Sequence, residues 1–180
     1  MGIIQLIATL PFPIQIGLGK ILGTLIFIFS KNRKHITETN IRLCFPELGK
    51  QKQDQLIKDT IDANAIGLME TAAAWRLLAE NFRSKITVHG LENLEAAKRQ
   101  GKGVLLVGAH YTTLDMGGVL VSLFSDVDVM YRPHTNPLFD QFMKKSRERF
   151  CHKVIDRTDI RSVIKSLKAG DVLWYAPDQD

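Results

Sequence analysis

Cysteine is scarce in this 180-residue chain, which contains only Cys44 and Cys151. Two cysteines are too few for the disulfide framework of a small secreted domain or for a metal cluster. Reduced thiols facing the cytosol are the simplest account of them. The chain also has no CxxC pair, no glycine-rich phosphate loop and no G-x-S-x-G elbow, so it lacks the motifs of those three kinds of site.

Charge is almost absent from the first 30 residues, which contain no acid and one base, Lys20. After Pro11 and Pro13, the apolar piece of about 16 to 17 residues is at the short limit for a membrane-spanning helix. A basic cluster at 31–35 follows directly and would place the downstream side in the cytoplasm. We therefore expect residues 1–30 to be a hydrophobic, membrane-associating segment, with a helix packed on the rest of the folded chain as the alternative.

The remainder of the chain has the composition of a folded protein, with 45% hydrophobic and 24% charged residues overall. We assign residues 31–180 to one domain. The net charge of +5 allows an anionic partner. Between Arg132 and Lys168 ten bases face four acids, a local charge of +6. No nucleic-acid-binding motif accompanies this charge, so a membrane surface, a phosphorylated lipid or an acidic carrier protein fits better, and solvated helix faces are the alternative.

Strand-like and helical segments alternate from Gly103 to the end of the chain. Apolar runs end at Gly108, Tyr131, Ile155 and Ala176, and helical segments separate them. This alternation predicts an α/β fold with a mostly parallel sheet flanked by helices. Upstream, the pattern predicts a long helix over residues 54–80 and a strand over residues 86–89.

Three polar residues each follow the end of a predicted strand: His110, Arg132 and Asp178. In parallel sheets, binding sites lie beyond the carboxyl ends of the strands. We therefore expect these residues to share one pocket, in which the rigid guanidinium of Arg132 could hold a phosphate or a carboxylate.

His110 and Asp115 form an H-x4-D pair across the turn between a predicted strand and a predicted helix. If the turn folds one residue onto the other, the carboxylate can accept a hydrogen bond from one imidazole nitrogen. The other nitrogen is then free to act as a general base. In the alternative interpretation, His110 closes a strand and Asp115 is an ordinary acid at a helix start.

Two other functions remain open at this point. Asp178 and Asp180 form a D-x-D pair, which in a glycosyltransferase would bind a nucleotide sugar through a divalent ion. A non-catalytic, membrane-peripheral lipid-binding module would use the basic segment as its docking face.

The chain resembles the lipid A late acyltransferases, the lauroyl and myristoyl transferases of Gram-negative inner membranes. The resemblance rests on ordered blocks between about residue 33 and the last residue. These are Asn40-Ile-Arg-Leu-Cys-Phe-Pro-Glu47, the Gly103–Gly118 block with its H-x4-D motif, Tyr131-Arg-Pro-His-Thr-Asn-Pro137, Asp156-Arg157, and Trp174-Tyr-Ala-Pro-Asp-Gln-Asp180.

The resemblance implies a glycerolipid-acyltransferase-like fold on the cytoplasmic face of a bacterial inner membrane. The enzyme would transfer an acyl group from acyl carrier protein to a hydroxyl of a phosphorylated glycolipid, a lipid A precursor, without a cofactor or a metal. His110 and Asp115 match the family's catalytic pair. The predicted substrate-binding residues are Arg132, Asn136, Arg149 and Asp178. Family members continue beyond the last block, so we expect this chain to be truncated at its C-terminus.

Overall fold

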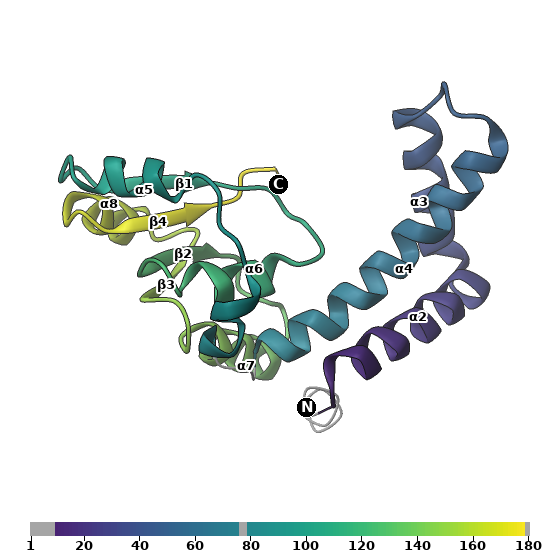
Figure 1. Ribbon diagram of the computed structural model, residues 1–180, viewed down its shortest axis with the longest axis horizontal. Coiled ribbons are helices and arrows are strands. Elements are labelled where there is room, and N and C mark those ends of the chain that lie inside the picture. Colours follow the sequence, from purple (N-terminus) through teal and green to yellow (C-terminus); the bar gives the residue numbers. More distant parts are fainter. Residues whose placement is uncertain (1–9, 76–78, 179–180) are drawn as a thin grey trace. The chain divides into compact units, whose positions relative to one another are not determined.

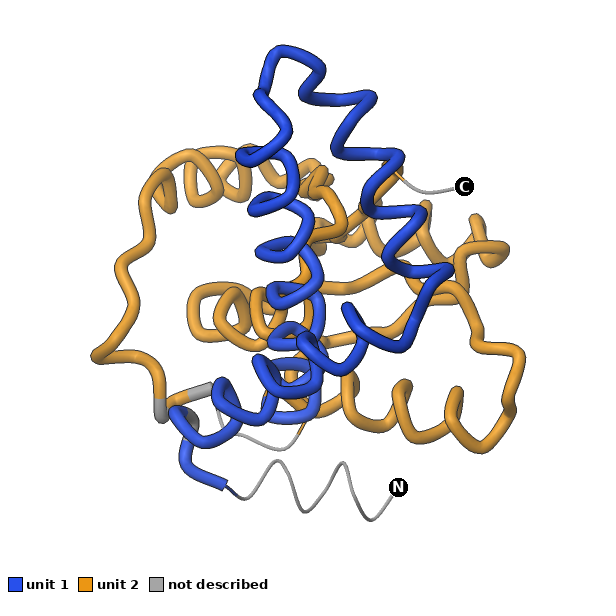
Figure 2. Tube along the Cα trace, turned by 90° about the vertical axis from the view of Figure 1, so that its right-hand side faces the viewer, with its two compact units in different colours: residues 1–73 blue, residues 74–180 orange. Residues whose placement is uncertain are grey.

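The computed structural model describes residues 10–75 and 79–178 and divides into two compact units, Met1–Ala73 and Ala74–Asp180 (Figure 2). This division comes after Ala73. The boundary expected at residue 30 instead falls between the first two described helices. Residues 31–73 fall in the first compact unit, together with the apolar N-terminal segment, and the predicted extent of the acyltransferase domain stays a prediction. Unit 1 is helical, and unit 2 contains the whole described sheet (Figure 1).

Unit 1 consists of α2 (Phe12–Phe29), α3 (Lys31–Cys44) and α4 (Lys50–Ala74), the last of which runs to the division. A small core joins all three, with Ile41, Ile57 and Ile61 buried and Phe27 packed against them. No single helix among the described residues is long and apolar enough to cross a membrane. Helices α2 and α3 pass that test only as a pair bent by 93°.

Two glycines of α2 allow its close approach to α4. A Cβ atom on Gly19 would lie 2.9 Å from the Cα atom of Ile66, and one on Gly23 would lie 3.0 Å from the Cα atom of Asp62. A side chain at position 19 would therefore collide with the backbone of α4, and one at position 23 would also overlap the side chain of Asp62, whose Oδ1 lies 2.5 Å from the Cβ position. Because the glycines are four residues apart, they lie on one face of α2 and form a flat contact for the second helix.

Unit 2 begins with a 3₁₀ helix, η1 (Ala79–Lys85), and α5 (Leu91–Lys98). The rest alternates in the order β1 (Val104–Val107), α6 (Leu114–Val121), β2 (Val127–Tyr131), α7 (Pro137–Arg147), β3 (Lys153–Asp156), α8 (Ile160–Lys168) and β4 (Val172–Tyr175). The strands pair in the order β1-β4-β2-β3, and every pairing is parallel. The predicted α/β fold with a parallel sheet flanked by helices is confirmed. The strand expected at residues 86–89 is wrong, because that segment forms no ladder in the structure.

Helices cover the two faces of the sheet through different side chains. On one face, Tyr131 of β2 packs with Met143 of α7 and with Trp75. On the other face, Ser166 of α8 donates a hydrogen bond to Asp128 of β2.

Local capping residues set the two ends of helix α8. Asp159 caps the start of α8 by accepting a hydrogen bond from the N–H of Ser162. Gly170, with φ of 90°, follows its last turn and ends it.

Candidate functional site

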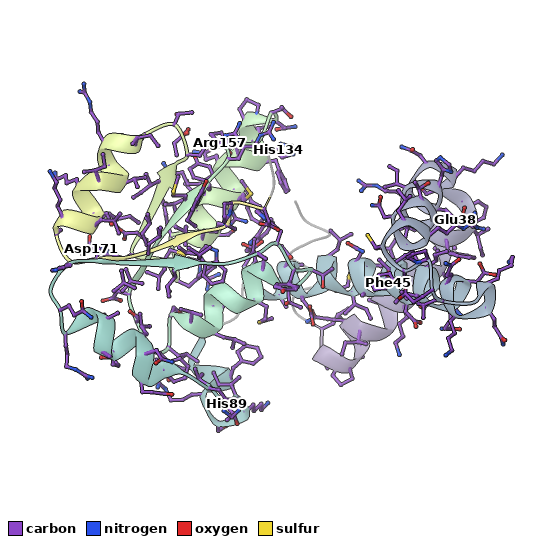
Figure 3. The ribbon with its side chains drawn as sticks, turned by 90° about the horizontal axis from the view of Figure 1, so that it is seen from above. Glu38, Phe45, His89, His134, Arg157 and Asp171 are labelled. Carbon is purple, nitrogen blue, oxygen red and sulfur yellow. The ribbon has the colours of Figure 1, made fainter. Side chains whose placement is uncertain are left out.

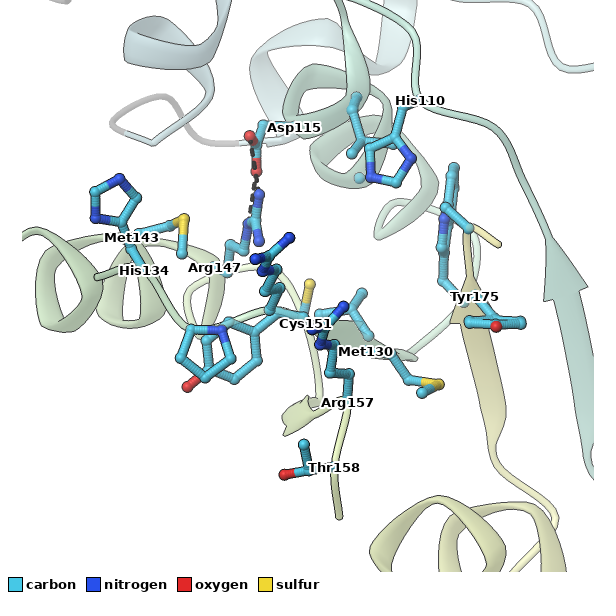
Figure 4. A pocket seen from close by; sticks show the side chains of 18 of the residues that line it. His110, Asp115, Met130, His134, Met143, Arg147, Cys151, Arg157, Thr158 and Tyr175 are labelled. Atoms are coloured by element: carbon cyan, nitrogen blue, oxygen red, sulfur yellow. Dashed lines mark hydrogen bonds and ion pairs between the residues drawn. The ribbon is translucent and has the colours of Figure 1, made fainter. Parts of the chain in front are cut away.

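A pocket of about 790 Å³ opens at the carboxyl edge of the sheet in unit 2 (Figure 4). This volume is within the range of roughly 300–1,000 Å³ that small-molecule sites occupy. The ends of strands, the first turn of α6 and the second half of α7 form its walls. His110, Arg132 and Asp115 line it. The predicted convergence of residues that follow different strands is confirmed for His110 and Arg132.

The turn after β1 brings His110 to the pocket. The N–H of Gly108 donates a hydrogen bond to the carbonyl of Tyr175, which extends the pairing of β1 with β4 by one residue. A Cβ atom on Gly108 would lie 2.7 Å from Cζ2 of Trp174. The absence of a side chain therefore lets the backbone turn directly over the indole ring. His110 emerges beside the segment that follows β4.

Asp178 holds His110 through both carboxylate oxygens. Oδ1 lies 2.7 Å from Nδ1 of the imidazole, and Oδ2 accepts the backbone N–H of His110 at 2.8 Å. The backbone hydrogen bond and the imidazole contact lower the pKa of Asp178 from its usual value. The carboxylate is therefore ionised at neutral pH and accepts a hydrogen from Nδ1. This tautomer leaves the lone pair of the imidazole on Nε2.

Asp115 binds Arg147 instead of His110, which differs from the expected contact (Figure 4). Its two oxygens accept hydrogen bonds from Nε and Nη2 of Arg147, at 2.8 and 3.2 Å. The two side chains are only 12% and 19% exposed. Strand order explains the difference. Strand β4 is the neighbour of β1, so the residue after β4 reaches the imidazole, whereas the first turn of α6 faces α7.

The other predicted binding residues have different surroundings. Arg132 lines the pocket directly after β2. The side-chain oxygen of Asn136 caps α7 by accepting the N–H groups of Leu138 and Phe139, at 3.0 and 3.2 Å. Arg149 donates from Nη1 to the carbonyl of Trp75 at 2.5 Å and is not among the residues that line this pocket. The predicted substrate-binding roles of all four residues, Arg132, Asn136, Arg149 and Asp178, stay predictions.

The sequence pattern assigned no site role to two arginines that line the pocket, Arg147 and Arg157. Arg147 is one of ten bases in the basic segment, and it lies four residues after Met143 on the same face of α7. Arg157 follows β3, where the carboxylate of Asp156 accepts both the backbone N–H and the hydroxyl of Thr158 at 2.8 Å. Position after a strand marks Arg157 by the same logic that marked Arg132.

Cys151 also lines the pocket, although it is distant in sequence from His110. Its side chain is buried, and burial raises the pKa of the thiol to about 12. The thiolate is the nucleophilic form of cysteine. At neutral pH this side chain therefore contributes packing to the wall and not a nucleophile.

A second group of titratable residues lies at the opposite end of the strands. Ligand atoms of Asp128, His152 and Asp171 lie within 4.8 Å of one another, a spacing that could hold a metal ion. However, the ammonium of Lys153 lies 2.6 Å from Oδ2 of Asp171 and 3.3 Å from Oδ2 of Asp128. Lys153 therefore supplies the positive charge that balances the two carboxylates. Asp171 is labelled in Figure 3. The other suggested metal pair includes Asp180, which lies outside the described residues.

A carboxylate-held histidine at the mouth of a partly apolar pocket defines a site suited to activating a hydroxyl group. Comparison with known proteins identifies the family. The chain belongs to the family of bacterial lipid A biosynthesis acyltransferases, which it matches over residues 1–180.

Three relatives from Escherichia coli (strain K12) show the extent of the likeness. The chain is 36% identical over its whole length to a lipid A biosynthesis lauroyltransferase and 33% identical to a palmitoleoyltransferase, covering 59% of each. It is 28% identical over 171 residues to a myristoyltransferase, with 93% of this chain and 51% of that protein aligned. The chain thus spans somewhat more than half the length of these relatives.

Proposed function

We propose that this chain carries the catalytic site of an acyltransferase of the glycerolipid-acyltransferase-like class. The enzyme moves a fatty acyl group from an acyl carrier protein thioester to a hydroxyl of a lipid A precursor. The observation that carries the proposal is the hydrogen-bonded pair of His110 and Asp178 at the pocket. Family membership supports the reaction class, and the names of the relatives support lipid A as the acceptor.

His110 is the general base. Its Nε2 removes the proton from the acceptor hydroxyl as the oxygen attacks the thioester carbonyl carbon. A carbon–oxygen bond forms, and the carbonyl oxygen becomes an oxyanion. When this intermediate collapses, the carbon–sulfur bond breaks, and the imidazolium returns the proton to the departing thiolate. Asp178 stabilises the imidazolium and fixes its tautomer, as the carboxylate of a catalytic triad does.

Arg147 is suited to stabilising the oxyanion. Asp115 engages its Nε and Nη2, whereas Nη1 has no hydrogen-bond partner among the described residues. A guanidinium fixed in this way needs no reorganisation when negative charge develops, which is the basis of electrostatic catalysis. Asp115 would then be a positioning residue for Arg147. This role would explain why Asp115 belongs to the H-x4-D motif although it does not contact the base, His110.

The arginines at the pocket favour an anionic acceptor. Arg132 and Arg157 follow neighbouring strands and both line the pocket. Guanidinium groups bind phosphate in a bidentate manner, which suits the headgroup of a phosphorylated glycolipid. The acceptor is a membrane lipid, so the site works at the cytoplasmic face of the bacterial inner membrane. The apolar surface of α2 is the proposed contact with that membrane.

The two other functions have less support. A metal-dependent glycosyltransferase would need the carboxylate of Asp178 as a ligand, but His110 engages both of its oxygens. The family comparisons favour acyl transfer. A non-catalytic lipid-binding module gives no reason for a carboxylate-held imidazole at the pocket.

The test is an acyl-transfer assay of the full-length protein in detergent, with acyl carrier protein thioesters and a lipid A precursor. General-base catalysis contributes roughly 10²–10⁴-fold to rate, so His110→Ala should lose at least that. His89→Ala, which changes an exposed histidine that does not line the pocket, is the matched control. Near-complete transfer by His110→Ala, with the control also active, would exclude His110 as the base.

A further inference from the structure

The apolar part of the pocket lies between α6 and the sheet. Val129 and Trp174 form the sheet side, and the strand register places them next to each other on one face. Helix α6 contributes Leu114 and Gly118, which are four residues apart and therefore lie on the same side of the helix. Phe150, from the segment between α7 and β3, also lines this space.

Gly118 and Phe150 are in close contact. A Cβ atom on Gly118 would lie 3.0 Å from Cε2 of Phe150 and 3.7 Å from its Cδ2. Because Gly118 has no side chain, the backbone of α6 lies directly against the edge of the aromatic ring. A methyl group at position 118 would force the ring to move by a few tenths of an ångström.

The ring of Phe150 is also held by neighbours other than Gly118. Phe150 packs against the buried cluster of Trp75, Tyr131 and Met143. Trp75 in turn contacts the ring of Phe142 edge-on, with centroids 5.5 Å apart. Interiors packed in this way resist displacement, because few voids are available to accept a shifted side chain. Because Phe150 also lines the pocket, the pocket is the open space available to a displaced ring.

We propose that Phe150, held between Gly118 and this cluster, forms the floor of the acyl-chain site and limits the length of the chain that the enzyme transfers. The proposal rests on the proposed acyl-transfer function. The ligand is the unbranched hydrocarbon tail of the thioester. One methylene group more or less in an apolar pocket changes discrimination by roughly 10–200-fold, so a small movement of the floor is sufficient to change the preferred chain.

Gly118→Ala tests the floor, and Gly117→Ala is its matched control. Both substitutions add one methyl group to α6 and raise its helix propensity equally, but nothing lies within 4 Å of a Cβ atom at position 117. Saturated carrier-protein thioesters that differ by two carbons compete for one acceptor, and mass spectrometry measures the ratio of products. We expect Gly118→Ala to shift the ratio toward the shorter chain by roughly tenfold or more. Gly117→Ala should leave the ratio unchanged.

Phe150→Leu tests the opposite direction and keeps the proposal testable if Gly118→Ala does not fold. Leucine removes the ring and deepens the site, so the product ratio should shift toward the longer chain. An unchanged product ratio in folded, active Phe150→Leu protein would overturn the proposal. So would identical ratios for Gly118→Ala and Gly117→Ala. If wild-type protein transfers no acyl chain of any length, the proposed function itself fails, and that outcome is distinct from both.

Discussion

Two carboxylates beside the pocket have different tasks at the scale of single residues. Asp178 holds the imidazole of His110, and Asp115 holds the guanidinium of Arg147. An H-x4-D motif invites the conclusion that its two members touch, because they are close in sequence. In this fold the acid that contacts the histidine lies 68 positions away in sequence. In the proposed mechanism, the motif instead supplies the base, His110, and the acid that positions Arg147.

Asp178→Asn should lower kcat strongly and leave KM nearly unchanged. The amide of asparagine can donate a hydrogen bond to Nδ1, which favours the tautomer with the hydrogen on Nε2 and removes the lone pair that the base needs. The expected loss is roughly 10²–10⁴-fold, the range of general-base catalysis. Initial rates with a saturating thioester measure it.

Asp115→Asn in the same assay separates the two carboxylates. It retains one acceptor oxygen for Arg147 but removes the charge, so it should weaken transition-state stabilisation without changing the tautomer of His110. The acidic limb of the pH–rate profile should then keep its wild-type position. If Asp178→Asn keeps the wild-type rate while Asp115→Asn loses it, Asp115 is the partner of His110 in the working enzyme.

The two cysteines should differ sharply in reactivity. Cys44 is exposed, whereas burial raises the pKa of Cys151 to about 12. At pH 8 roughly one Cys151 in ten thousand would be a thiolate, the reactive form. Native protein should therefore give one rapid equivalent with a disulfide reagent, and unfolded protein should give two. Cys151→Ala should retain acyl transfer, whereas rapid modification of both native thiols would contradict the protonated state of Cys151.

At the scale of elements, Asp128 joins three parts of unit 2. Its fully buried carboxylate accepts hydrogen bonds from Ser166 Oγ at 2.6 Å and from Lys153 Nζ at 3.3 Å, and it contacts His152 Nδ1 at 2.9 Å. It thereby ties β2 to the start of β3 and to α8. Lys153 also binds Asp171, and this contact raises the pKa of the lysine. These contacts are at the opposite end of the strands from the pocket, so their expected role is stability.

Asp128→Ala should therefore destabilise unit 2 without acting on the chemistry directly. Breaking a buried charged network by removing one partner costs roughly 3–5 kcal/mol. Ser166→Ala, which removes a single hydrogen bond to the same carboxylate, should cost only about 1–3 kcal/mol. Urea unfolding followed by tryptophan fluorescence measures both, because Trp75 and Trp174 are the chain's two tryptophans and both belong to unit 2. Equal midpoints for Asp128→Ala and wild type would refute this role.

The sequence predicted where the strands and helices lie along the chain better than it predicted which strands are adjacent in the sheet. Alternating apolar and helical segments identified all four described strands after Gly103, because that periodicity is local. Strand order is not local. The last strand, β4, inserts between β1 and β2, and no pattern in its four residues indicates this choice. The same limit explains the site: residues after strands were found, but the partner of His110 depends on which strands are adjacent.

At the scale of the whole molecule, the two units present different surfaces. In unit 2 the pocket is lined by Arg132, Arg147 and Arg157. In unit 1, one side of α2 exposes five aliphatic residues at helical spacing: Ile14, Leu18, Ile21, Leu25 and Ile28. Ile21 and Ile28 are 61% and 59% exposed. A contiguous apolar stripe of this kind is typical of a surface that binds another apolar phase.

The basic start of α3 follows this stripe directly and strengthens the case for a lipid surface. Lys31, Arg33 and Lys34 lie in its first turn. A basic residue near an anionic leaflet contributes about 1 kcal/mol to binding, and an aliphatic side chain that leaves water contributes about 1.5–3 kcal/mol. The two contributions differ in their response to salt, because only the electrostatic part is screened. We therefore expect binding to anionic vesicles to weaken with salt but to persist in part.

Ile21→Glu combined with Ile28→Glu should abolish the part of vesicle binding that persists in salt. Each substitution removes an aliphatic contact and places a carboxylate at the lipid, so the partition coefficient should fall roughly tenfold or more per site. Asn64→Glu, an exposed polar position on α4, adds a negative charge outside the stripe and is the control. Cosedimentation with anionic phospholipid vesicles at low and high salt measures the partition. If the double variant partitions like the control at both salt concentrations, α2 does not bind lipid, and its apolar stripe must contact protein instead.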